Sequence, residues 1–110
     1  MRKVLVLASA SSARRRVLEG AGVPFTPDPS GTDEDRLKAT LQARSAPEMA
    51  RALALAKALA VSARKPEALV LGADQVLECE GRLFAKPRDK NEARAQLVRL
   101  RGRGHRLVNG

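Results

Sequence analysis

The stretch that decides the fold is Val4-Leu5-Val6-Leu7-Ala8-Ser9-Ala10-Ser11-Ser12. Its first five residues form a continuous β-branched and aliphatic run, which is typical of a strand buried on both faces. The small polar residues that follow are typical of the start of a helix. Apolar residues then recur at helical spacing from residue 13 to residue 21, and glycines at 20 and 22 supply a stop. The sequence therefore opens with a buried strand that runs into a helix.

Helices and strands continue to alternate along the rest of the chain. Residues 23–46 hold prolines at 24, 27 and 29, so they are expected to be an extended strand or loop that is not helical before Asp35. The elements expected after it are a helix over 49–63 behind a capping box at 45–48, a second buried strand over 68–77, a short strand over 82–84, a helix after Asp89 with Ala93, Leu97 and Leu100 inward, and a strand over 105–108. This alternation predicts an α/β fold with a largely buried sheet.

The composition fits one domain with an aliphatic, helix-rich core. Apolar residues make up 44% of the 110 residues, with two Phe and no Trp or Tyr. A formal charge of +9 favours polyanionic partners such as phosphates, nucleic acids or anionic lipid headgroups. Binders of single-stranded nucleic acid usually add aromatic stacking platforms, and only Phe25 and Phe84 are available here. We therefore expect no stable nucleic-acid partner, and a small phosphorylated ligand explains the charge equally well.

Two further features bear on the compartment. Cys79 is the single cysteine, which leaves no disulfide framework and no thiolate cluster for zinc and favours a reducing, cytoplasmic location. The basic start at residues 1–3 precedes an apolar run of five residues, which is too short for a signal peptide or a membrane span. We expect no membrane partner.

The junction between the first strand and the first helix is a candidate phosphate site. In open α/β sheets ligands bind at the carboxyl ends of strands, where a helix N-terminus offers free N–H groups to an anion. Ser9, Ser11 and Arg14 would add hydrogen bonds and a guanidinium fork. The alternative is an ordinary serine cap followed by a solvated basic helix face. Neither a Walker lysine loop nor a GxGxxG motif is present.

Asp74 is the most informative carboxylate, because it lies in Gly72-Ala73-Asp74-Gln75 within an otherwise apolar run. A carboxylate placed there is partly desolvated and needs a metal, a lysine or a set of hydrogen bonds to compensate. It is either a magnesium ligand or general base, or a structural residue at a bend in the strand.

Two lysines and an acidic run are candidates to accompany Asp74. Lys57 and Lys86 lie in apolar settings, where each either extends its amine to water or forms a cationic clamp for phosphoryl chemistry. The run Asp33-Glu34-Asp35 either brings a second carboxylate to a metal or is simply solvated.

Taken in order, these residues resemble the Maf family of nucleoside triphosphate pyrophosphatases, also called septum formation inhibitors. The matching segments span nearly the whole chain and are Leu7 to Arg15, Asp33-Glu34, Ala56-Lys57-Ala58, Gly72 to Val76, Lys86-Pro87 and Gly102-Arg103-Gly104-His105. The resemblance implies a Maf/ITPase-like α/β fold, with a mixed, largely buried sheet and flanking helices, in which residues 1–110 form the N-terminal portion of a single domain. Family members run to nearly twice this length, so we expect the isolated chain to be incomplete at its C-terminus, unstable and weakly active or inactive.

The resemblance also implies a reaction and a role for each site residue. Water attacks the α-phosphate of a nucleoside triphosphate and releases pyrophosphate, with a divalent metal, Mg²⁺ or Mn²⁺, bridging carboxylates and phosphates. Asp74 corresponds to the proton acceptor and a metal ligand, and Glu34 and Asp33 would hold metal or water. The remaining roles fall to Ser9, Ser11, Arg14 and Arg15, which would bind the phosphates, and to Lys57 and Lys86, which would neutralise the leaving group. A homodimer is a further implication.

Two substitutions relative to the family pattern bear on the preferred base. Ala13 and Gln75 stand where the dTTP/UTP-preferring branch carries an arginine and a threonine, which favours the branch that hydrolyses 7-methyl-GTP. Two rival functions also stay open: a non-catalytic module that binds nucleotide or nucleic acid, and a structural or division-regulating partner.

Overall fold

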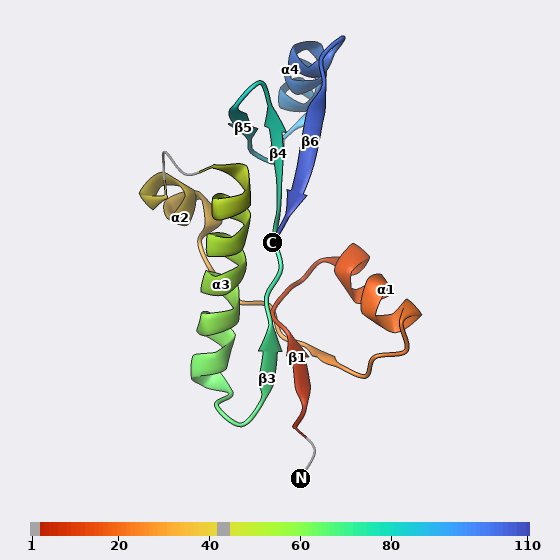
Figure 1. Ribbon diagram of the computed structural model, residues 1–110, viewed down its shortest axis with the longest axis vertical. Helices are drawn as coiled ribbons and strands as arrows, with labels where there is room; N and C mark the ends of the chain where they lie inside the picture. Colours follow the sequence, from red (N-terminus) through yellow and green to blue (C-terminus); the bar gives the residue numbers. More distant parts are fainter. Residues whose placement is uncertain (1–2, 42–44) are drawn as a thin grey trace.

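The computed structural model describes residues 3–41 and 45–110 (Figure 1). The basic start at residues 1 and 2, and residues 42–44 of the predicted loop, lie outside the described part. The helices are α1 (Ser12–Gly20), α2 (Glu34–Thr40), α3 (Ala46–Arg64) and α4 (Lys90–Leu100), and the strands are β1 (Leu5–Leu7), β2 (Thr26–Pro27), β3 (Leu69–Leu71), β4 (Gln75–Cys79), β5 (Arg82–Phe84) and β6 (His105–Asn109). Of the helices described, none is both long and apolar enough to cross a membrane.

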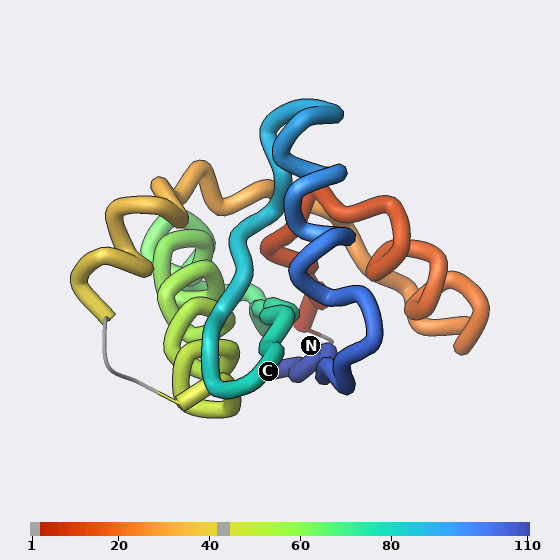
Figure 2. Tube along the Cα trace, turned by 90° about the horizontal axis from the view of Figure 1, so that it is seen from above, coloured from red at the N-terminus to blue at the C-terminus, as the bar shows by residue number. Residues whose placement is uncertain are grey.

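The strands form two three-stranded sheets, and the predicted mixed α/β class is confirmed. The first sheet is parallel in the order β2-β1-β3, and the second is antiparallel in the order β5-β4-β6. The two sheets follow one another along the long axis of an elongated molecule of 52 × 31 × 23 Å (Figure 1). Viewed from above, α2 and α3 lie on one side of the strands and α1 on the other (Figure 2).

The long helix α3 supplies most of the core and joins the two sheets. Near its C-terminal end Val61 packs with Val6 of β1 and with Ala8, which follows that strand. Nearer its N-terminal end Leu53 packs with Val76 of the second sheet. Burial of these aliphatic side chains stabilises the fold by about 1.5–3 kcal/mol for each large residue. Because one rigid helix contacts both sheets, it fixes where the end of β1 lies relative to the start of β4.

The predicted strand over 68–77 is wrong as a single element, since the chain leaves the first sheet after Leu71 and joins the second at Gln75. The physical reason is a close approach to α3. A Cβ atom at Gly72 would overlap the backbone carbonyl oxygen of Ala54, so only glycine allows the chain to cross here. Nor is the first part of the predicted strand buried on both faces, because Leu69 is 53% exposed.

Smaller differences concern helices α2 and α4. Helix α2 begins at Glu34. The prolines and the polar cluster predicted that no helix would begin before Asp35, so the helix begins one residue earlier than expected. The prediction that Leu97 faces inward is wrong, since Leu97 is 67% exposed whereas Ala93 and Leu100 are half-buried. Helix α4 lies at one end of the long axis (Figure 1), and no face of it is fully buried.

Candidate active site

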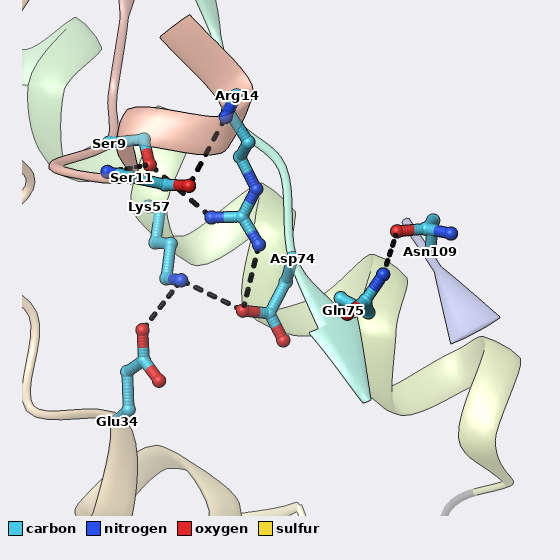
Figure 3. Close-up of polar contacts among 8 residues, drawn as sticks. All are labelled: Ser9, Ser11, Arg14, Glu34, Lys57, Asp74, Gln75 and Asn109. Atoms are coloured by element: carbon cyan, nitrogen blue, oxygen red, sulfur yellow. Dashed lines mark hydrogen bonds and ion pairs between the residues drawn. The ribbon is translucent and has the colours of Figure 1, made fainter. Parts of the chain in front are cut away.

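The end of β1 and the start of α1 arrange two serines around one arginine (Figure 3). Ser11 is the N-cap of α1, and its Oγ accepts a hydrogen bond of 3.2 Å from the backbone N–H of Arg14. The buried Oγ of Ser9 accepts from the backbone N–H of Ser11 at 3.0 Å and from Nη1 of Arg14 at 3.3 Å. Ser9 therefore orients the Arg14 guanidinium, whose Nη2 lies 4.0 Å from Oδ1 of Asp74.

Asp74 is buried at the crossing between the two sheets, with 5% of its surface exposed. Its backbone N–H and C=O pair with Gly110 at 3.0 and 2.9 Å, which holds the residue beside the end of β6. Oδ1 accepts a hydrogen bond of 2.8 Å from Nζ of Lys57. Oδ2 is buried and has no hydrogen-bond partner among the described residues. A buried carboxylate oxygen without a protein partner is costly, so this oxygen calls for a further group such as water, a metal ion or substrate.

Lys57 joins Asp74 to a second carboxylate (Figure 3). It lies on the buried face of α3, and its Nζ is 2.6 Å from Oε1 of Glu34 at the start of α2. Burial raises the pKa of Glu34, but the hydrogen bond and charge of Lys57, aided by the charges of Lys38 and Arg14, outweigh it and lower the pKa below its ordinary value. Glu34 is therefore held as a carboxylate.

Of the cavities that adjoin this cluster, two share several lining residues. The first, of about 380 Å³, is lined by polar groups from the β1–α1 junction and by the loop at residues 29–32. The second, of about 420 Å³, extends over the antiparallel sheet. Ser11, Arg14, Glu34, Lys57 and Lys86 line both cavities. The exposed Lys86, from the segment after β5, is thus placed at the same site as the buried pair.

Other predicted site residues lie apart from the cluster or make other contacts. Asp33 is the N-cap of α2, where Oδ1 accepts a hydrogen bond of 3.1 Å from the backbone N–H of Arg36. Ala13, Arg15 and Asp33 are exposed and line neither cavity. Gln75 does line the second cavity, and its side-chain amide donates to Oδ1 of Asn109 at 3.1 Å.

The structure adds a loop that the sequence did not assign to the site. Pro29, Ser30, Gly31 and Thr32 line the first cavity. Arg64, at the end of α3, holds this loop by donating to the carbonyl oxygens of Pro29 and Ser30 at 3.0 and 3.3 Å and to Oδ1 of Asp28 at 3.2 Å. The sequence signal for this loop is a cluster of small polar residues after a proline. The same pattern is typical of loops without any function, so it could not assign the loop to the site.

The carboxylates suit a divalent metal that the substrate helps to hold. Residues 3–41 and 45–110 contain no group of three or more His, Cys, Asp and Glu side chains arranged to bind a metal ion. Mg²⁺ usually takes one or two carboxylates and completes its shell with water and substrate phosphates. The carboxylates of Asp74 and Glu34 provide that number of protein ligands.

Sequence comparisons give the family to which the chain belongs. The family profile described as Maf-like protein matches residues 4–110. A nucleoside triphosphate pyrophosphatase of Paramagnetospirillum magneticum is 49% identical over 106 residues, covering 94% of this chain and 55% of the relative. A nucleoside triphosphate pyrophosphatase of Granulibacter bethesdensis is 50% identical over 106 residues, which cover 94% of this chain and 54% of the relative. A dTTP/UTP pyrophosphatase of Thermomicrobium roseum is 49% identical over 105 residues, which cover 94% of this chain and 46% of the relative. The chain thus spans about half the length of these curated relatives, and it belongs to the Maf family.

Proposed function

We propose that the whole protein hydrolyses a nucleoside triphosphate to the monophosphate and pyrophosphate. The observation that carries the proposal is the buried Asp74 beside a cavity lined by cationic groups. One of its carboxylate oxygens is held by Lys57, and the other has no partner among the described residues. The names of the relatives, nucleoside triphosphate pyrophosphatase and dTTP/UTP pyrophosphatase, support the same reaction.

In the proposed reaction Asp74 acts as the general base. Its Oδ2 takes a proton from a water molecule, and the water oxygen forms a bond to the α-phosphorus. The bond between the α-phosphorus and the oxygen bridging to the β-phosphate breaks, and pyrophosphate leaves with that oxygen. The Lys57 amine stays on Oδ1 and fixes the direction of Oδ2. Positioning of the base and water therefore contributes alongside proton transfer.

Cationic groups would stabilise the charge that develops on the leaving pyrophosphate. Arg14 and Lys86 line both cavities, and Ser9 accepts a hydrogen bond from the Arg14 guanidinium. A divalent metal held by Asp74 and Glu34 would, when bound, polarise the phosphate and lower the pKa of the attacking water. The net charge of +9 favours capture of a substrate that carries several negative charges.

The preferred base is the finer part of the proposal. Ala13 and Gln75 support preference for a 7-methyl-GTP-like substrate by their resemblance to that branch. Gln75 lines the cavity over the antiparallel sheet, which agrees with contact to the nucleoside. The name of the Thermomicrobium roseum relative favours dTTP and UTP instead, so these nucleotides are the necessary comparison.

The experiment that tests the reaction is hydrolysis in ¹⁸O-labelled water with dTTP, UTP and 7-methyl-GTP as substrates. Attack on the α-phosphorus places the label in the nucleoside monophosphate and leaves the pyrophosphate unlabelled. Label in the pyrophosphate, or release of a diphosphate and inorganic phosphate, would refute the proposal. Triphosphate binding with no hydrolysis would make the non-catalytic binding module the better description.

A further inference from the structure

A row of three apolar side chains crosses the antiparallel sheet next to the site. Leu77 of β4 pairs in register with Phe84 of β5 on one side and with Leu107 of β6 on the other. Residues paired in this way lie on the same face of a sheet, with Cβ atoms about 4.5–5.5 Å apart. Phe84, Leu77 and Leu107 therefore form one continuous strip, called here the apolar row.

The apolar row faces the cavity and not the core. The next pair along the strands, Val76 and Val108, points to the opposite face and packs on the core cluster around Leu53 of α3. All three residues of the row line the cavity of about 420 Å³, and Leu107 is 58% exposed. Two residues further along β4, on the same face, the Gln75 amide is hydrogen bonded to Asn109. The sheet thus presents an apolar strip bordered by a pair of amides.

The two cavities differ in chemistry at the residues that they do not share. Those of the first include Ser9, Ser30 and Thr32, which offer hydroxyl groups. Those of the second include the apolar row, Pro87 and Gln96. Their shared residues include Arg14, Lys57 and Lys86. A molecule that occupied both cavities would meet hydroxyl groups at one end, cations in the middle and apolar side chains at the other.

We propose that the apolar row is the binding surface for the nucleoside, with the base packed against Phe84. The proposal rests on the function proposed above and adds the direction in which the substrate lies. The α-phosphate would then sit at Asp74, which lines the second cavity, and the β- and γ-phosphates would point toward Ser9 in the first. Pyrophosphate leaves on the β1–α1 side and the monophosphate stays over the sheet. A flat base suits this surface, because stacking on an aromatic ring needs no particular pattern of hydrogen bonds.

The test compares two ligands that share phosphates but differ in the nucleoside. One is an α,β-methylene nucleoside triphosphate, which cannot be cleaved between the α- and β-phosphates, and the other is inorganic tripolyphosphate. Equilibrium affinities are measured for the wild-type protein, Phe84→Ala, the conservative Phe84→Leu and the control Leu83→Ala. Leu83 precedes Phe84 on β5, pairs with Glu78 and lines neither cavity.

We expect Phe84→Ala to weaken binding of the nucleoside triphosphate analogue by about tenfold, with a smaller loss for Phe84→Leu. The affinity for tripolyphosphate should stay as in the wild type for all variants, and Leu83→Ala should change neither affinity. Equal losses for both ligands, or no loss for the analogue, would overturn the inference. Because both ligands are titrated into one preparation, an unfolded fraction affects them alike. Neither ligand has to be hydrolysed, so a protein that lacks turnover but shows the Phe84 effect refutes the proposed reaction and leaves this surface in place.

Discussion

The Nζ atom of Lys57 lies 2.8 Å from Oδ1 of Asp74, and each side chain is 7% exposed. A buried ion pair carries a desolvation cost that its own attraction barely offsets. This pair also leaves Oδ2 of Asp74 without a hydrogen bond among the described residues. The ion pair therefore adds little to the stability of the fold, but it orients the carboxylate of Asp74 so that Oδ2 is the available oxygen.

The free energy of unfolding should decrease as the pH is lowered, and part of this decrease should depend on Glu34. Its folded-state pKa lies below the ordinary value of 4.5, so the carboxylate stabilises the fold above about pH 4.5 and loses this contribution as the pH falls through the folded-state pKa. Because the side chain is 43% exposed, we expect an effect of about 0.5–1 kcal/mol.

Urea unfolding of the wild-type protein and Glu34→Gln measures this contribution. Between about pH 7 and pH 3 the wild-type protein should lose more unfolding free energy than the variant, which has no carboxylate to protonate. Parallel pH profiles for the two proteins would show that Lys57 does not hold Glu34 in solution.

Gly72→Ala should disturb Asp74 without touching any site residue. The added Cβ would overlap the carbonyl oxygen of Ala54, which the rigid helix α3 cannot easily move. We expect a loss of about 1–3 kcal/mol in unfolding free energy, together with lower turnover. Gly20→Ala is the matched control, since nothing lies within 4 Å of a Cβ there and its φ is not positive. Equal stability of the two variants would mean that the chain does not press on α3 at this point.

Arg64→Ala should weaken phosphate binding from a distance. Arg64 holds the loop at residues 28–30, which leads into the lining of the first cavity. Its contacts are solvent-exposed, so we expect tripolyphosphate affinity to fall by no more than about fivefold. Arg103→Ala removes a comparable exposed pair with Glu80 and lines neither cavity. Titration calorimetry should separate the two variants, and an identical response would remove the assigned role of Arg64.

Chelation of divalent metal should stop pyrophosphate release, and the variants should differ in their Mg²⁺ requirement. Glu34→Gln removes a carboxylate beside Asp74, so we expect it to need about tenfold more Mg²⁺ for half-maximal rate. Asp33→Asn preserves the N-cap of α2 and should leave the requirement unchanged, because Asp33 lines neither cavity. A raised requirement in Asp33→Asn would restore Asp33 as a metal ligand.

Local patterns in the sequence predict much of this fold. The strand and helix at residues 5–20 follow from an apolar run and a serine cap, which are effects of near neighbours. The long helix α3 follows from its capping box and its Ala/Leu content. For the site, the family resemblance singled out Lys57 and Asp74, and the structure brings them into contact.

Features set by distant contacts could not be predicted from the sequence. The break at Gly72 depends on α3, which lies many residues earlier in the chain. The apolar row depends on the register of three strands, which an alternating pattern on one strand does not reveal. The sequence placed Asp33 beside Glu34 as a second, weaker candidate ligand. The start of α2 separates the two, because Asp33 caps the helix and Glu34 contacts Lys57.

The proposed role of Asp74 is tested most directly by pyrophosphate release from wild-type protein and Asp74→Asn in the presence of Mg²⁺. We predict metal-dependent release by the whole wild-type protein and a rate lower by about 100-fold or more in the same protein with Asp74→Asn, while both still bind the α,β-methylene triphosphate. Release by Asp74→Asn at close to the wild-type rate, or no release by a wild-type protein that binds the analogue, would contradict a general base at Asp74.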